Sequence, residues 1–264
     1  MLAALLGVPR DEATFALSGM HHFTWITGVM VQGRERLPEI LARADELPKL
    51  GTDPDLIRAL GAVPSPYYRY YAHPDRILAM TEGRPVRAQE LMAIQDQMLA
   101  EFRRWKPGEK IAALNTRGAV WYDEIVVPAL LALAEHQTVE LVLSVDNRDA
   151  LPWLSPQAIL EAPVPIRGGV PGKPRATTLP EDIRALIHGN AAYEMLAVEA
   201  IVEDDRTKAL RALMSNLMVR SYNQARGLLD VIWPEAQPKG ISIQPQAPKG
   251  DEPMKAPSLH YGDR

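Results

Sequence analysis

Residues 14–31 have the sequence TFALSGMHHFTWITGVMV. β-branched and aromatic residues dominate this stretch, and Gly19 and Gly28 interrupt it. Such a composition is typical of strands, because branched and ring-bearing side chains pack well on a pleated surface. The stretch therefore predicts two strands, and residues 32–34 (Gln-Gly-Arg) predict the turn that follows them.

Helical and strand patterns alternate along the rest of the chain. Between Arg87 and Phe102 apolar residues recur three or four positions apart, which predicts an amphipathic helix. A strand is predicted over 159–166, and Pro163 and Pro165 should confine it to the edge of a sheet. The other predicted elements are helices at 36–48, 53–62, 122–135, 181–203, 205–213 and 219–232, and a strand at 139–145. Together these elements predict an α+β fold.

Length and composition exclude several classes of protein. The chain has 264 residues, which is enough to bury a sizeable core, and its formal net charge of −4 is unlike that of a duplex-DNA binder. It contains no Cys, so disulfide scaffolds, thiol nucleophiles and thiolate metal sites are excluded. No apolar run approaches the roughly 18 residues of a membrane-spanning helix. We therefore expect no nucleic-acid partner, no membrane partner and a cytoplasmic location.

The C-terminal segment differs in composition from the rest. Residues 234–264 contain six Pro and three Gly and show no apolar periodicity. A segment with so little apolar surface cannot offset the entropy lost on ordering. We expect one folded domain over 1–233 and a flexible tail over 234–264.

Two groups of side chains are candidates for chemistry. His21 and His22 fall in the strand-rich stretch, where adjacent residues face opposite sides, so only one imidazole is expected to face a given cavity. Four Tyr fall within residues 67–71, and packing in a core is the simpler explanation for them. A phenol acts as a general base only where a cation lowers its pKa from about 10, and Arg69 or Arg87 could supply that charge.

Eight segments, taken in order, resemble the family 4 glycoside hydrolases. The resemblance spans residues 1–233 and rests on the ordered set of segments, since none of them is specific alone. The segments are Gly19-Met-His-His-Phe-Thr-Trp-Ile26, Pro66-Tyr-Tyr-Arg-Tyr-Tyr71, Arg87-Ala-Gln-Glu90, Arg117-Gly-Ala-Val-Trp-Tyr122, Val126-Val-Pro-Ala-Leu-Leu-Ala-Leu133, Glu140-Leu-Val-Leu-Ser-Val-Asp-Asn147, Tyr193-Glu-Met-Leu-Ala-Val-Glu-Ala200 and Ala209-Leu-Arg-Ala-Leu-Met214.

The resemblance carries expectations about fold and reaction. Family members join an N-terminal dinucleotide-binding Rossmann domain, of lactate and malate dehydrogenase type, to a C-terminal catalytic domain, and this chain resembles only the latter. They use NAD to oxidise the sugar at C3, a Tyr to remove the C2 proton, and a divalent metal to stabilise the enediolate before elimination, addition of water and reduction. The resemblance thus implies an incomplete NAD- and manganese-dependent glycosidase acting on a sugar or sugar phosphate, most simply a 6-phospho-glycoside.

The same resemblance assigns roles to three residues. His22 aligns with the family's metal-binding His, Tyr67 with its catalytic base, and Arg87 with an Arg that contacts the substrate. For Tyr68, Tyr70 and Tyr71 packing remains the expectation. The family's other metal ligand is a Cys of the N-terminal half, and no residue of this chain is expected to bind NAD. A homodimer or homotetramer is also implied.

Two other functions remain open at this point. A non-enzymatic oligomerisation or sugar-binding module of the same fold would account for the absence of a G-x-G-x-x-G motif and of Cys. A dehydrogenase without glycosidase activity would share the fold but would leave Tyr67 without a role.

Overall fold

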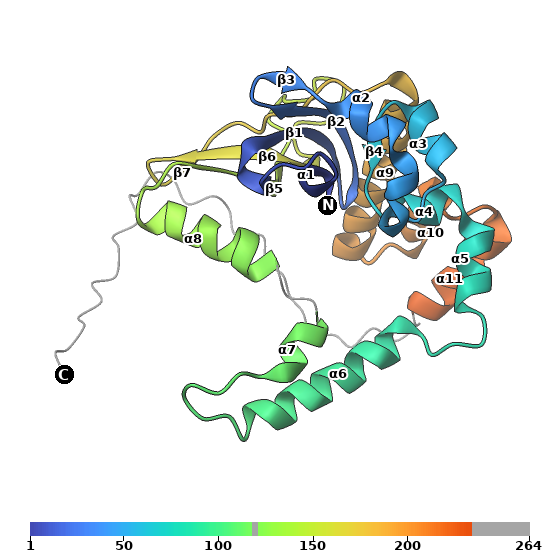
Figure 1. Ribbon diagram of the computed structural model, residues 1–264. Coiled ribbons are helices and arrows are strands. Elements are labelled where there is room, and N and C mark those ends of the chain that lie inside the picture. Colours follow the sequence, from blue (N-terminus) through green and yellow to red (C-terminus); the bar gives the residue numbers. More distant parts are fainter. Residues whose placement is uncertain (118–120, 234–264) are drawn as a thin grey trace, which may run out of the picture.

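One antiparallel sheet organises the chain in this computed structural model, which describes residues 1–117 and 121–233 (Figure 1). Its strands lie in the order β3-β2-β1-β6-β5, with β4 beside β2 and β7 beside β6. The strands are β1 (Ala13–Met20), β2 (Phe23–Val31), β3 (Arg34–Glu35), β4 (Val63–Pro64), β5 (Val139–Asp146), β6 (Ile159–Arg167) and β7 (Val170–Pro171).

The two strands predicted over 14–31 are confirmed, but His21 and His22, which were expected to lie in a strand, form the turn between them. Met20 pairs with Phe23, so the turn consists of His21 and His22, with φ of +52° and +62°. A two-residue turn with both residues in the left-handed region matches the right-handed twist of the strands it joins. The two glycines lie inside the strands. At Gly19 a Cβ would come within 2.3 Å of the Phe23 carbonyl oxygen, so this approach of the backbones requires glycine.

The strand predicted at 159–166 is confirmed as β6, but its predicted edge position is wrong. β6 lies between β1 and β5. The carbonyls of Pro163 and Pro165 accept hydrogen bonds from the N–H groups of Arg175 and Gly172 at 2.8 and 2.7 Å. Since a strand residue's N and C=O point the same way, the nitrogens that lack a proton face away from β5. The long ladder between β5 and β6 therefore loses no hydrogen bond to the prolines.

Helices lie on both sides of the sheet, and most of them were predicted. The bounds at 87–102 and 181–203 agree with the prediction, and the mixed helix and sheet fold is confirmed. The helices are α1 (Leu2–Leu5), α2 (Leu37–Ala42), α3 (Pro54–Leu60), α4 (Tyr68–Ala72), α5 (Pro74–Thr81), α6 (Arg87–Phe102), α7 (Ala112–Arg117), α8 (Val127–Ala134), α9 (Glu181–Glu203), α10 (Arg206–Ser215) and α11 (Tyr222–Ile232). Short 3₁₀ turns occur at Arg10–Glu12, Ala44–Glu46 and Pro48–Leu50, and a π turn at Tyr122–Val126. Among the described residues, no helix is long and apolar enough to cross a membrane.

The β1–β2 hairpin contributes to two separate cores. Val29 and Val31 pack with α1, α2 and α3, whereas Met20 and Trp25 pack with Ile183 and other apolar residues of α9. The register of the hairpin shifts between Ala16 and Leu17, and such a bulge changes the face that the following residues present. Because the two cores pack against the hairpin, they fix the position of the turn at its end.

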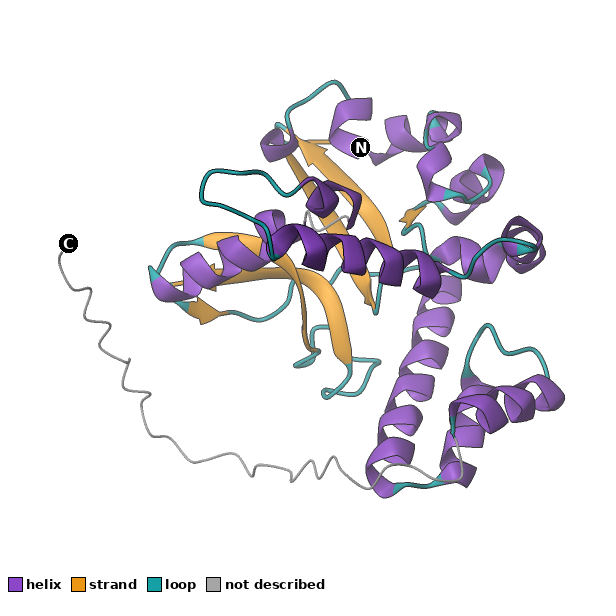
Figure 2. Cartoon of the chain, turned by 90° about the horizontal axis from the view of Figure 1, so that it is seen from below, coloured by secondary structure: helices purple, strands orange, loops and turns teal. Residues whose placement is uncertain are grey.

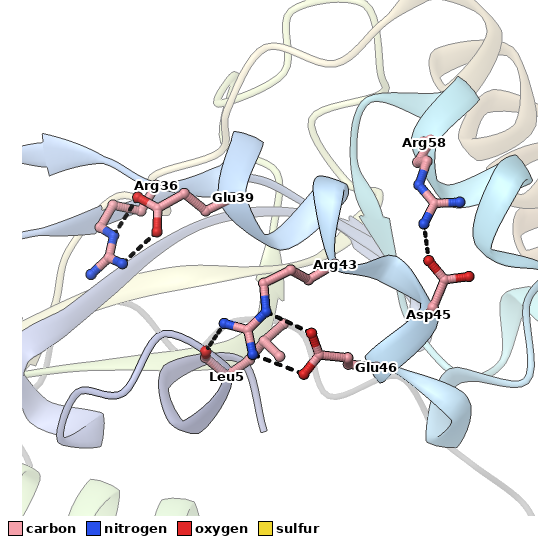
Figure 3. Close-up of polar contacts among 7 residues, drawn as sticks. All are labelled: Leu5, Arg36, Glu39, Arg43, Asp45, Glu46 and Arg58. Atoms are coloured by element: carbon pink, nitrogen blue, oxygen red, sulfur yellow. Dashed lines mark hydrogen bonds and ion pairs between the residues drawn. The ribbon is translucent and has the colours of Figure 1, made fainter.

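The side chain of Arg43 joins the end of helix α1 to the 3₁₀ turn Ala44–Glu46. Arg43 donates to the Leu5 carbonyl oxygen at the end of α1 and pairs with Glu46 at 2.7 and 2.8 Å (Figure 3). The last carbonyls of a helix have no partner within it, so Arg43 satisfies one of them. The same guanidinium, as hydrogen-bond donor, holds the pKa of the Glu46 carboxyl below its usual value.

Helix α6 stands away from both cores. In Figure 1, α6 and α7 lie below the body of the domain, and in the view from below of Figure 2 helices cross in front of the sheet; none of the side chains of α6 is buried. Its apolar residues recur as predicted, yet none of them is fully buried: Leu91, Ile94 and Met98 are half-buried, and Phe102 is 48% exposed. The pattern therefore predicts the helix correctly, although this structure buries no apolar face of it.

Candidate active site

The candidate site is built on the His21-His22 turn and on one carboxylate of β6. Glu161 pairs with Gly19, the residue at which β1 meets β6. Its Oε2 accepts from the backbone N–H of His22 at 2.7 Å, and its Oε1 lies 2.9 Å from Nδ1 of the same residue. The side chain of Glu161 is 16% exposed and that of His22 is 64% exposed. A largely buried carboxylate thus holds an exposed imidazole.

The segment between β4 and α4 brings Tyr67 to the same turn. Ser65 donates its hydroxyl to the His22 carbonyl oxygen and accepts from the backbone N–H of Tyr67 at 3.3 Å. The rings of His22 and Tyr67 stack with centroids 5.3 Å apart and an angle of 23° between their planes. The structure therefore places together His22 and Tyr67, the two residues to which the family resemblance assigns metal binding and proton removal.

His21 lies on the same side as His22, contrary to the expectation for a strand. The two rings are 6.4 Å apart and nearly parallel, because both residues are in the turn and not in the alternating part of a strand. Nδ1 of His21 lies 3.9 Å from Oε1 of Glu194 on α9. Burial raises the pKa of the Glu194 carboxyl, while His21 and a hydrogen bond from Asn190 act in the opposite direction.

The other tyrosines of the cluster divide between core and surface. Tyr68 is 5% exposed, and Tyr71 packs with it and with Phe23 in the core that includes Trp25. The packing prediction is confirmed for these two. It is wrong for Tyr70, which is 38% exposed because its ring lies outside, against Tyr67.

Neither arginine contacts the Tyr67 phenol in the described structure. The guanidinium of Arg69 lies over the ring of Tyr70, 5.2 Å from its centroid. Arg87 is the first residue of α6, and it pairs with Glu90 at 2.7 Å with its side chain 65% exposed. Its contact with a substrate stays a prediction.

The described residues suit one metal ligand and no dinucleotide. Since Nδ1 of His22 faces a carboxylate, Nε2 is left to bind a ligand, the arrangement common in metal-bound histidines. Among the described residues no group of three or more His, Asp or Glu could hold an ion, so further donors would have to come from elsewhere. All strand pairs described are antiparallel, and a dinucleotide site needs a parallel unit with a glycine-rich turn. The described residues therefore do not fit NAD.

Comparison with known proteins identifies the family. Residues 17–219 match the family 4 glycosyl hydrolase C-terminal domain. The chain belongs to this family. The family 4 domain is 23% identical over 230 residues to a 6-phospho-β-glucosidase of Escherichia coli K12, covering 81% of this chain and 51% of that protein. It is 24% identical over 242 residues to the 6-phospho-β-glucosidase BglT of Thermotoga maritima, covering 88% and 56%.

Solved structures show the same fold. The family 4 domain superposes on the Thermotoga maritima 6-phospho-β-glucosidase with NAD and glucose-6-phosphate with a TM-score of 0.76, 20% identity, and coverage of 87% of this chain and 55% of that one. A 6-phospho-α-glucosidase from gut microorganisms with NAD and Mn²⁺ gives a TM-score of 0.72, 20% identity, and coverage of 87% and 56%. The chain spans about half the length of the curated relatives it matches.

Three residues of the site were not predicted from the sequence. Glu161 and Ser65 fix the backbone and ring of His22, and Glu194 faces His21. Of these, Glu161 had a sequence signal, since it is a charged residue in an otherwise apolar strand pattern. A partly buried charge in a strand requires a partner.

Proposed function

We propose that this domain takes part in hydrolysing the O-glycosidic bond of a 6-phospho-glycoside, as the C-terminal half of a family 4 glycosidase. The observation that carries the proposal is the stacking of His22 on Tyr67, with 5.3 Å between ring centroids, while Glu161 contacts Nδ1 of the same imidazole. A metal-binding histidine in contact with a phenol provides the two groups needed to remove a proton next to a sugar carbonyl. The named activities of the relatives support the same substrate class.

Each residue has a defined part in this proposal. His22 holds a divalent cation, for which manganese is the candidate, through Nε2; when bound, such a cation polarises a carbonyl and stabilises the negative charge that develops on it. Tyr67 accepts the proton on its phenol oxygen. A phenol needs a nearby positive charge to do so at neutral pH, and the stacking on His22 places Tyr67 beside the residue that would hold the cation.

Substrate recognition is assigned to Arg87. An arginine at the start of a helix presents several N–H donors to a phosphate, and its ion pair with Glu90 is exposed to solvent. An exposed pair of this kind is weak and can exchange its carboxylate for a phosphate. Arg87 would have to approach the turn when substrate binds, since it contacts neither His22 nor Tyr67 in the described residues.

Hydride transfer lies outside what these residues can perform. The described part of the chain offers no site for NAD, so no oxidation or reduction step is assigned to it. We assign NAD binding to an N-terminal half like that of the relatives. This domain then supplies the proton acceptor and one metal ligand.

Self-association is part of the same proposal. Helix α8 lies against β5 and β6, yet on its other side Val127 is 46% exposed and Leu130 is 60% exposed. Neighbouring apolar side chains on a surface are typical of protein contacts. A homodimer or homotetramer that covers α8 should dissociate in Leu130→Lys, as measured by sedimentation equilibrium, and an unchanged mass would contradict this assignment.

A fusion tests the function. The domain is joined to the dinucleotide-binding half of the Thermotoga maritima relative, NAD binding is verified, and hydrolysis of nitrophenyl 6-phospho-glucosides is measured with Mn²⁺. We expect turnover that requires both NAD and Mn²⁺ and is lost in His22→Ala. A fusion that binds NAD but shows no turnover with either anomer contradicts the proposal.

A further inference from the structure

The carboxylate of Glu161 makes two contacts that together constrain its neighbour. Oε2 accepts from the backbone N–H of His22 and Oε1 faces the ring Nδ1. An ionised carboxylate can only accept hydrogen bonds. The nitrogen facing it at 2.9 Å must therefore carry the proton when the imidazole is neutral.

The backbone of the turn makes the first contact necessary. His22 has a φ of +62°, and a non-glycine residue in this region is held there by its surroundings. Because the turn lies beyond the last strand pair, Met20 with Phe23, the ladder supplies no partner for the N–H of His22. Glu161 supplies that partner, and Ser65 binds the carbonyl of the same residue.

The position of Glu161 is itself fixed. It is the residue of β6 that pairs with Gly19 of β1, and on its other side it pairs with Ser144 of β5. The carboxylate thus extends from the middle of the sheet to the end of a hairpin, across 139 positions of sequence. A group so placed sets the orientation of the imidazole more firmly than the exposed turn could alone.

We propose that Glu161 is a positioning residue that fixes the tautomer of His22 with its proton on Nδ1 and so presents an unprotonated Nε2 to a divalent cation. The inference rests on the proposed function for the identity of the ligand, but the tautomer follows from the two hydrogen bonds. One carboxylate satisfies two donors here, and no neutral side chain of the same shape can do so.

Glu161→Gln makes this point testable. The amide has one accepting oxygen and one donating NH₂ group. If the oxygen keeps the backbone N–H of His22, the NH₂ group faces Nδ1, which must then lose its proton. We expect the proton to move to Nε2 in this variant, which blocks the atom assigned to the cation.

The experiment is long-range ¹H–¹⁵N correlation of the histidine rings in the 264-residue chain, above the pH range in which histidine titrates, followed by addition of Mn²⁺. In the parent chain we expect His22 protonated on Nδ1, with its ring signals broadened by Mn²⁺. In Glu161→Gln we expect the other tautomer and about 10- to 100-fold more Mn²⁺ for the same broadening. The matched control is Glu140→Gln on β5, the strand beside β6, which removes a carboxylate that pairs with Arg175; it should leave both the tautomer and the Mn²⁺ response unchanged.

The outcomes separate this inference from the proposed function. If His22 of the parent chain carries its proton on Nε2, the inference is overturned without any variant. A folded Glu161→Gln in which His22 keeps the parent tautomer also overturns it. The expected tautomers without broadening at His22 by Mn²⁺ support the positioning role of Glu161 and contradict binding of the cation by His22 in this chain alone; the fusion described above then tests the proposed function separately.

Discussion

The imidazole of His22 stacks on the phenol of Tyr67, with 5.3 Å between ring centroids. These residues lie 45 positions apart, one in the β1–β2 turn and the other just before α4, and Ser65 hydrogen-bonds to the backbone of both. The contact gives a structural reason to consider the two residues as one site. It also makes several expectations specific.

Gly19→Ala should destabilise the domain. The new Cβ would lie 2.3 Å from the Phe23 oxygen and 2.5 Å from the Thr24 Cα, so the backbone of the hairpin has to move. Overpacking of this kind costs about 1–3 kcal/mol, which thermal unfolding would register as a lower midpoint.

The control is Gly227→Ala in α11, where nothing lies within 4 Å of the added atom. Alanine in place of an exposed helical glycine should stabilise by about 0.5–1 kcal/mol. If both variants shift the unfolding midpoint in the same direction, the close approach of the two strands at Gly19 does not require glycine there.

Glu194→Gln should change the pH dependence of stability. Burial raises the pKa of this carboxyl in the folded state, so the folded chain binds its proton more tightly than the unfolded chain does. The contribution to the free energy of unfolding is then fully present below the unfolded pKa and is lost as pH rises through the folded pKa.

The glutamine variant cannot ionise at this position and should therefore lack that loss. Relative to the parent chain, its stability in denaturant titrations should rise between acidic and neutral pH. Parallel stability curves for the two proteins across this range would show that Glu194 ionises in the folded chain as freely as in the unfolded one.

The 264-residue chain by itself should not bind NAD. Its described strand pairs are antiparallel and its sequence has no G-x-G-x-x-G motif, so no helix N-terminus is prepared for a pyrophosphate. Calorimetric titration should give no heat of binding. Saturable binding of NAD would show that this domain contributes a dinucleotide site of its own.

The sequence predicted those features that depend on local periodicity. Apolar spacing predicted α6 and α9. The helix predicted from residue 53 begins there because the Asp53 side chain accepts from the N–H of Asp55 and Pro54 occupies the first turn, both of them local features. These signals lie within a few residues of one another, so no knowledge of the tertiary structure is needed.

Features that depend on distant pairing were missed. The local sequence did not predict the turn at His21 and His22, because positive φ is uncommon in residues other than glycine and the glycines on either side are stronger turn signals. The partner of His22, Glu161, is 139 residues away. Its role becomes visible only once β6 lies between β1 and β5. The predicted edge position allowed β6 only one neighbouring strand.

The role of Tyr67 is tested most directly by exchange of the C2 proton of glucose 6-phosphate with solvent deuterium, in the fusion with the dinucleotide-binding half. Tyr67→Phe removes one oxygen from a residue that is 54% exposed, so we expect NAD binding and Mn²⁺ binding to persist while exchange falls by about 10²- to 10⁴-fold. Tyr70→Phe, whose ring lies against Tyr67, should retain exchange at the parent rate. Exchange near the parent rate in Tyr67→Phe would contradict the account, because Tyr67 would then be a stacking partner of His22 and not the base.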